Sequence, residues 1–312
     1  MRIFTQTPTR VSLLGGGTDL PVFSDKYGGV VLSMAINLRQ LMAFDTENTS
    51  TPLMPENGSE TFYKAFLEEF KLPNCSYNCI SDVPIQSGLG ASASAAVGLT
   101  ASLAQITGKK LTRTQIAEKA WDIEVNKLGL YGGKQDQYAA SYGGLNLITF
   151  DQDGKVLVSP IDRKKAEFWE QRILLFFTGS VREKPNIQDK LKELSDEQIA
   201  ALQKIKECTM EAHIDINELR VASLGKLMQD AWEAKKKSNP LVTTPHIDEL
   251  YEAGMNAGAL GGKLLGSGGG GFMAFLVDLP QQEAVKKALQ ELGAIWYDFS
   301  IDWNGVQTRI LP

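Results

Sequence analysis

A run of small residues at positions 84–94, PIQSGLGASAS, constrains the fold of this chain more than any other segment. It lies between a strand-like segment, residues 77–83, and an apolar segment, residues 92–106, that we predict to be a helix. Glycines let the backbone turn tightly and approach a ligand closely. Free amide groups at the start of a helix, together with the helix dipole, favour an anion. The run therefore predicts a polyphosphate cradle, and tight helix packing alone is the alternative explanation. The cradle residues are Ser87, Gly88, Leu89, Gly90, Ala91, Ser92, Ala93 and Ser94.

Neither of the two glycine-rich runs of the chain fits a standard nucleotide-binding motif. The first run lacks the GxxxxGK[ST] pattern of a Walker loop. The second run, residues 261–271, contains a formal GxGxxG, but it leads directly into a predicted strand instead of opening a helix. Four consecutive glycines indicate a backbone that must approach a substrate or nucleotide, and a plain flexible turn is the alternative. Gly268 and Gly269 are the candidate contacts.

The composition narrows the classes of protein to which this chain can belong. Its 312 residues leave room for two domains, and a net charge of −5 argues against nucleic acid as the main partner. No apolar stretch of 18 residues is present, so no membrane segment is expected. Three cysteines and an N-terminus without an apolar signal core predict a cytoplasmic protein.

The spacing of apolar residues predicts an α+β fold that ends in a strand–loop–strand–helix–strand unit. The polar, proline-containing residues 151–165 mark a domain junction. The expected strands are residues 2–5, 11–14, 30–36, 40–45, 145–150, 173–178 and 272–277. The expected helices are residues 61–71, 92–106, 112–128, 136–142 and 244–256, one or two helices within 204–237, and residues 281–292.

Two acidic residues and one arginine supply the chemistry that phosphoryl transfer needs. That reaction needs magnesium held by oxygen ligands, neutralised charge, and a group that orients or deprotonates the attacking hydroxyl. Ser92 and Glu124 are the candidate magnesium ligands, and Asp136, just after a glycine break, is the candidate base. Arg10 is expected to pair with Asp136 and to keep it ionised by lowering its pKa. Taken alone, Glu124 fits a surface position equally well.

A glycine turn after the first strands, residues 15–19, offers a site for the second substrate. It contains Gly16, Gly17, Thr18 and Asp19. The Asp19 carboxylate can accept hydrogen bonds from a sugar-like diol. A cap for the following segment is the alternative.

Residues 8–20, 84–94 and 263–272 resemble, in this order, the three motifs of the GHMP kinase family. With residues 133–138 the match runs over nearly the whole chain. Ala91 stands where the family usually has a serine, while Ser92 keeps the position that reaches magnesium. The resemblance implies ATP as donor and Mg²⁺ as cofactor. It also implies an N-terminal domain like domain 2 of ribosomal protein S5, residues 1–168, a ferredoxin-like C-terminal domain, residues 169–312, and an active site between them.

Within this family, the GGGTDLP version of the first motif is similar to that of the D-glycero-D-manno-heptose 7-phosphate kinases. GGKQDQY at residues 132–138 and GGLN at residues 143–146 support the same resemblance. It implies phosphorylation of the anomeric hydroxyl of the heptose 7-phosphate to the 1,7-bisphosphate for nucleotide-heptose synthesis. Lys134, Arg182 and Lys184 are the candidates for binding the distal phosphate.

Two other functions stay open at this point. One is a kinase of an unphosphorylated sugar, like fucokinase or galactokinase, and the other is a non-catalytic member of the fold that binds a sugar or nucleotide. The sugar anomer, the downstream nucleotide and the oligomeric state, with a homodimer as one alternative, also stay open.

Overall fold

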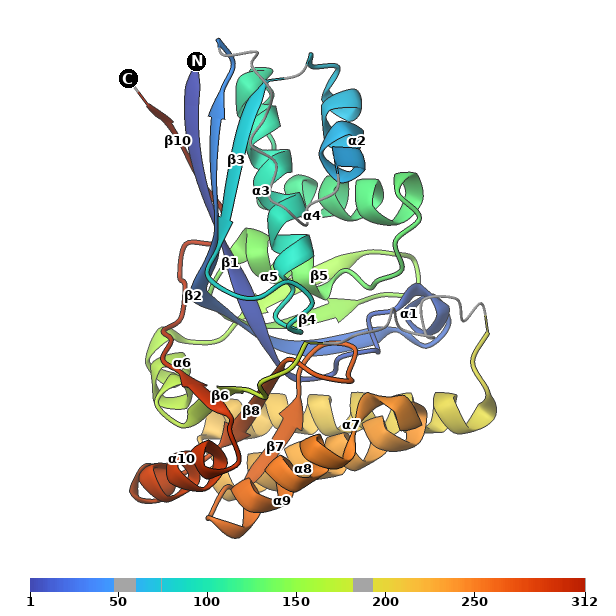
Figure 1. Cartoon of the computed structure of the whole chain (residues 1–312). Helices are drawn as coiled ribbons and strands as arrows, with labels where there is room; N and C mark the ends of the chain where they lie inside the picture. The colour runs from blue at the N-terminus through green and yellow to red at the C-terminus, as the bar shows by residue number, and fades with distance from the viewer. Residues whose placement is uncertain (48–59, 74, 182–192, 312) are drawn as a thin grey trace.

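Two antiparallel β-sheets and the helices around them make up the described part of the chain (Figure 1). The computed structural model describes residues 1–47, 60–73, 75–181 and 193–311. The predicted α+β class is confirmed. Within these residues, no helix combines the length and the apolar character needed to cross a bilayer.

The first sheet has the strand order β10-β1-β2-β4-β5, and β3 pairs with β2. Helices α2 to α5 cover one of its faces (Figure 1). The strands are β1 (Arg2–Leu14), β2 (Gly29–Asp45), β3 (Ser76–Ser81), β4 (Leu145–Phe150), β5 (Val156–Pro160) and β10 (Gln307–Leu311). The helices of this half are α1 (Pro21–Tyr27), α2 (Glu60–Phe70), α3 (Ala91–Ile106), α4 (Arg113–Asp122), α5 (Gln135–Tyr142) and α6 (Arg163–Glu170).

Strands β1 and β2 are each longer than the sequence predicts. Four short strands were expected where the structure has two long ones. Their pairing shifts register between Pro8 and Thr9. Such an irregularity lets a strand accommodate a proline, which has no backbone donor. The proline that suggested a break between two short strands therefore marks a bulge within β1 and not the end of a strand.

Helix α3, which is rich in alanine, serine and glycine, packs closely on β1 and β2. A Cβ on Gly98 would lie 2.7 Å from Thr7 Oγ1 and 2.8 Å from Met42 Sδ. Any larger residue here would require these side chains to move, so the glycine permits the close contact. Because α3 begins at the cradle, its close fit against β1 fixes the cradle relative to the sheet.

The second sheet has the strand order β7-β8-β6-β9. With the helices between its strands it forms the β-α-β-β-α-β arrangement of a ferredoxin-like domain, as predicted. Its strands are β6 (Ile173–Phe177), β7 (Gly261–Leu264), β8 (Phe272–Leu276) and β9 (Ile295–Tyr297). Its helices are α7 (Asp196–Glu218), α8 (Val221–Ser238), α9 (Pro245–Asn256) and α10 (Gln282–Glu291), with short 3₁₀ turns at Pro240–Val242 and Leu279–Gln281.

The two halves of the chain share one hydrophobic core. Val11 and Leu13 of β1 belong to the same buried cluster as Leu202 and Ile205 of α7. The boundary that we drew after residue 168 falls inside α6, and β10 returns to pair with β1 (Figure 1). The division into residues 1–168 and 169–312 stays a prediction. In space, the last strand completes the first sheet.

Candidate active site

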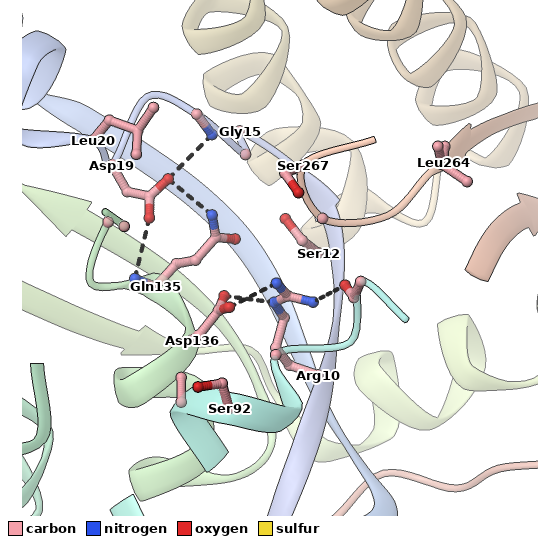
Figure 2. A pocket seen from close by; sticks show the side chains of 18 of the residues that line it. Arg10, Ser12, Gly15, Asp19, Leu20, Ser92, Gln135, Asp136, Leu264 and Ser267 are labelled. Atoms are coloured by element: carbon pink, nitrogen blue, oxygen red, sulfur yellow. Dashed lines mark hydrogen bonds and ion pairs between the residues drawn. The ribbon is translucent and has the colours of Figure 1, made fainter. Parts of the chain in front are cut away.

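A cavity of about 500 Å³ lies where the two halves meet (Figure 2). Side chains and backbone of both halves line it. The lining comes from the end of β1, the glycine turn after it, the 84–94 run, the residues around the start of α5, and parts of α8 and β7. The structure thus brings most of the predicted motifs around one space.

The cradle is a glycine turn that opens directly into α3. Gly88 and Gly90 have φ values of +87° and +73°, a region that glycine adopts without strain. Gly90 precedes the helix, and no side chain caps it. The amides of the first turn of α3 are therefore available to an anion.

The side chains of two predicted cradle residues, Leu89 and Ser94, serve the fold. Leu89 is fully buried in the hydrophobic core. Ser94 Oγ, also buried, hydrogen-bonds to the carbonyl oxygens of Thr7 and Pro8 at 3.0 and 2.9 Å. These contacts fasten the cradle to β1 while the other predicted cradle residues line the cavity.

Arg10 and Asp136 form the predicted ion pair. Arg10 Nε donates to Asp136 Oδ1 at 2.7 Å, and Nη2 donates to Oδ2 at 2.9 Å (Figure 2). Arg10 Nη1 also donates to the Gly88 carbonyl at 2.6 Å. Such bidentate, charge-assisted bonds fix both groups in direction as well as position. Arg10 is 4% exposed while the Asp136 side chain is 24% exposed, so the carboxylate remains accessible from the cavity.

Glu124 and Ser92, the predicted magnesium ligands, also meet. Ser92 Oγ donates to Glu124 Oε1 at 3.0 Å, and Gln137 Nε2 donates to Oε2 at 2.7 Å. The expected helix at 112–128 changes at Ile123–Lys127 into a π-helical turn, which carries Glu124. Such turns occur often at functional sites.

Burial determines the charge of Glu124. It raises the pKa of this carboxyl group to about 7, and the nearby Asp136 charge adds to the effect. No lysine or arginine forms an ion pair with it in the part of the chain that the structure describes. A buried carboxylate with only neutral partners, next to a hydroxyl, is a donor set that suits Mg²⁺. The described residues contain no cluster of three or more metal-binding side chains, and Mg²⁺ in nucleotide sites takes most of its ligands from phosphates and water.

We expect Glu124→Gln to stabilise the protein above pH 7 when magnesium and nucleotide are absent. Between the unfolded pKa near 4.5 and the folded pKa near 7, the folded state holds a proton that the unfolded state has lost. Stability therefore falls as pH rises through this window, by about 3 kcal/mol in total. Urea unfolding should show a gain of about that size at pH 8 and below about 1 kcal/mol at pH 5. An equal gain at both pH values, or the same pattern in the exposed-site control Glu207→Gln, would contradict this explanation.

Asp19 is held by the protein itself. Its carboxylate accepts hydrogen bonds from Gly17 N at 3.1 Å, Gln135 N at 3.2 Å and Gln135 Nε2 at 2.8 Å (Figure 2). Burial, and secondarily Asp136, raise the pKa of Asp19. A Cβ on Gly133 would lie only 1.9 Å from Asp19 Oδ2. Asp19 thus ties the glycine turn to the start of α5, although it also lines the cavity.

The other predicted substrate contacts divide between the cavity and the surrounding fold. Gly16 and Gly17 line the cavity. Thr18 is fully buried and hydrogen-bonds to the carbonyls of Gly15 and Val30.

Of the predicted phosphate-binding cations, Lys134 does not line the described cavity. Lys134 Nζ donates to Glu118 Oε2 at 3.0 Å and lies over the ring of Trp121. It is absent from the cavity lining. A glycine break shows that the chain turns, but it does not give the direction of the side chain that follows. Arg182 and Lys184 lie outside the described residues.

The second glycine run packs against the first one. A Cβ on Gly88 would lie 2.5 Å from the Leu265 carbonyl oxygen, and one on Gly271 would lie 2.2 Å from that of Ser87. Phe272 N donates to the same Ser87 oxygen at 2.9 Å. The close approach that four glycines predicted is therefore an approach to the cradle backbone. Both halves of the chain therefore contribute backbone to the cradle region.

Gly268 and Gly269 are not the glycines of this run that reach the cavity. Gly269 N donates to the Val242 carbonyl at 3.0 Å, and a Cβ on Gly268 would lie 2.6 Å from Val242 Cα. Gly266 and Ser267 line the cavity in their place.

Several lining residues escaped the analysis of the sequence. Lys263 begins the third motif, yet its position before a glycine run does not show which way it points. Lys235 lies in a run of three lysines, which is typical of a solvated helix face. Ser12 and Gln135 carry no pattern that distinguishes them from ordinary polar residues.

One cavity is therefore lined by a helix start that can hold phosphates, an oriented carboxylate and a buried acid compatible with a metal ion. The chain belongs to the GHMP kinase family. Models of the GHMP kinases N terminal domain and the GHMP kinases C terminal domain match residues 59–144 and 209–295.

Individual relatives agree with this assignment. The chain is 33% identical to a D-glycero-alpha-D-manno-heptose 7-phosphate kinase of Campylobacter jejuni subsp. jejuni serotype O:2, over 98% of both chains. The crystal structure of a D-glycero-D-manno-heptose 1-phosphate kinase from Bacteriodes thetaiotaomicron superimposes with a TM-score of 0.80 at 26% identity, over 99% of both chains. A putative sugar kinase from Campylobacter jejuni gives a TM-score of 0.77 at 29% identity, over 99% of this chain and 98% of that one.

Proposed function

We propose that this protein transfers the γ-phosphoryl group of ATP to the anomeric hydroxyl of D-glycero-D-manno-heptose 7-phosphate, giving the 1,7-bisphosphate and ADP. The observation that carries the proposal is the contact between the oriented carboxylate and the cradle. A Cβ on Gly90 would lie 3.0 Å from Asp136 Oδ2. A group that handles the acceptor hydroxyl therefore lies directly beside the predicted phosphate site. The similarity to the heptose 7-phosphate kinase supports the choice of sugar.

Each group around the cavity has a separate role in the proposed reaction. Asp136 orients the acceptor hydroxyl and accepts its proton as the oxygen attacks the γ-phosphorus and the bond to ADP breaks. Arg10 holds the carboxylate in position and adds positive charge beside the transferring group. The amides at the start of α3 hold the phosphates of the nucleotide. Glu124 and Ser92 would hold Mg²⁺, which supplies charge neutralisation on those phosphates.

The proposal is tested by ADP release across a panel of acceptors. The panel contains heptose 7-phosphate, the unphosphorylated heptose, fucose, galactose and mevalonate. We expect kcat/KM for heptose 7-phosphate to exceed that for every other acceptor by about tenfold or more. ³¹P NMR of the product should show a new anomeric phosphate.

Two outcomes would contradict the proposal. A preference for an unphosphorylated sugar would identify a kinase of the fucokinase or galactokinase type. ATP binding without turnover on any acceptor would indicate a non-catalytic member of the family.

A further inference from the structure

Two lysines of the second half of the chain extend to the glycine turn of the first half. Lys263, on β7, donates from Nζ to the Ser12 carbonyl oxygen at 2.7 Å. Lys235, on α8, donates from Nζ to the Gly16 carbonyl oxygen at 3.5 Å. A Cβ on Gly17 would lie 3.1 Å from Lys235 Nζ. Both lysines line the cavity, and Lys263 Nζ would also lie 4.0 Å from a Cβ on Gly16, so the two side chains reach the same turn.

These two ammonium groups lack the carboxylate partner that an enclosed lysine usually has. No ion pair within 4.0 Å joins either of them to an acid among the described residues. The nearby Asp19 carboxylate is occupied by the hydrogen bonds from Gly17 and Gln135. Burial lowers the pKa of Lys235, and burial together with the Lys235 and Arg10 charges lowers that of Lys263 to about 7. The Asp19 charge opposes part of this lowering of both pKa values, but Asp19 forms no ion pair with either lysine. Enclosing two like charges is unfavourable, and an anion bound directly to them would offset that cost.

An unpartnered hydroxyl lies in the same part of the cavity. Ser12 is 3% exposed, and its Oγ has no hydrogen-bond partner. It lines the cavity and projects from β1 on the same side as Arg10 (Figure 2). A Cβ on Gly16 would lie 3.3 Å from Ser12 Oγ, so the hydroxyl adjoins the turn that the lysines reach. A buried hydroxyl without a partner is costly unless a ligand satisfies it.

This cluster differs in position from the cradle that we assign to ATP. The cradle lies where Arg10 contacts Gly88. Lys263 contacts the Ser12 carbonyl and Lys235 contacts the Gly16 carbonyl, both further along the chain from Arg10 toward the glycine turn. The pair of lysines therefore extends from the Arg10–Asp136 pair toward the glycine turn, away from the start of α3.

We propose that Lys235, Lys263 and Ser12 bind the phosphate group that the acceptor sugar already carries. The inference rests on the function proposed above, which places the reacting hydroxyl at Asp136. The phosphate at the other end of the sugar accepts hydrogen bonds from two ammonium groups and one hydroxyl. Lysines suit this task because each provides several donors on a compact positive charge. This subsite takes the role that we first assigned to Lys134.

The variants Lys235→Met, Lys263→Met and Ser12→Ala test the proposal, with the exposed Lys237→Met of the same helix as matched control. The measured quantities are kcat and KM for heptose 7-phosphate and for the unphosphorylated heptose, and KM for ATP. Each lysine variant should raise KM for the phosphorylated acceptor about 10- to 100-fold, and the serine variant less. Constants for the free heptose and KM for ATP should change less than about threefold.

Equal losses on both acceptors, or a rise in KM for ATP, would overturn the proposal by showing that the lysines act on the transferred phosphate. The parent protein provides a separate check on the function itself. If the parent does not prefer the phosphorylated heptose, the proposed function fails before any variant is compared.

Inorganic phosphate supplies a second test that needs no variant. With ATP saturating and ionic strength fixed with chloride, phosphate should compete with heptose 7-phosphate and leave the rate on the free heptose unchanged. Equal inhibition of both acceptors would overturn the proposal. This test uses only the parent protein, so it decides the proposal even if one of the variants does not fold.

Discussion

Replacement of Asp136 by asparagine is expected to lower kcat on heptose 7-phosphate by about 10²- to 10⁴-fold. An asparagine oxygen can still accept one bond from Arg10, but the amide cannot take the proton of the acceptor hydroxyl. The change also leaves the 4% exposed Arg10 without its counter-charge. Steady-state ADP release measures kcat, and equilibrium titration with ATP shows whether the cradle is intact.

The matched control for this prediction is Asp151→Asn, which removes one carboxylate from an exposed position. It should keep the turnover of the parent. Parental turnover in Asp136→Asn would remove Asp136 from the mechanism. An effect confined to KM would show that this carboxylate positions the sugar without taking its proton.

Gly271→Ala is expected to lower the stability of the protein strongly. Gly271 has a φ of +103°, and an added Cβ would lie 2.2 Å from the Ser87 carbonyl oxygen. The neighbouring atoms belong to backbone and have little freedom to move. We expect the free energy of unfolding to fall by more than about 3 kcal/mol, as measured by urea denaturation.

Gly293→Ala separates the cost of an unfavourable backbone conformation from the cost of the steric clash with Ser87. Gly293 also has a positive φ, +86°, but a Cβ there would meet no atom within 4 Å. This control variant should lose only the free energy of holding an alanine at a positive φ, about 1 to 2 kcal/mol. Equal losses in the two variants would mean that the contact between the glycine runs contributes nothing.

The parts of the site that the sequence predicted are those that follow from local signals. The glycine–serine run before an apolar segment indicates a helix start whatever its surroundings. The chemistry of phosphoryl transfer then connects Arg10 with Asp136, and Ser92 with Glu124, and both pairs are in contact in the structure. Their roles in catalysis stay predictions until the variants are measured.

The parts that escaped prediction depend on how distant segments pack. Lys235 looks like a surface residue in its own helix and approaches the site only because α8 lies against the first half of the chain. Strand β10 has no pattern that separates it from other short strands, and its partner β1 lies at the opposite end of the sequence. Lys134 has the sequence context of a site residue, but Glu118 and Trp121 hold it elsewhere.

The contact between the two glycine runs also has a consequence for the order in which this protein matures. It joins segments that are far apart in the chain, and such non-local contacts form late in folding. A growing chain can make α3 and the first cradle residues well before residues 261–271 exist. The cradle then lacks the backbone that packs against Gly88. We therefore expect a chain to bind ATP in the cradle only after residues 261–271 have been synthesised and have packed against it. An unfinished chain would then not consume ATP.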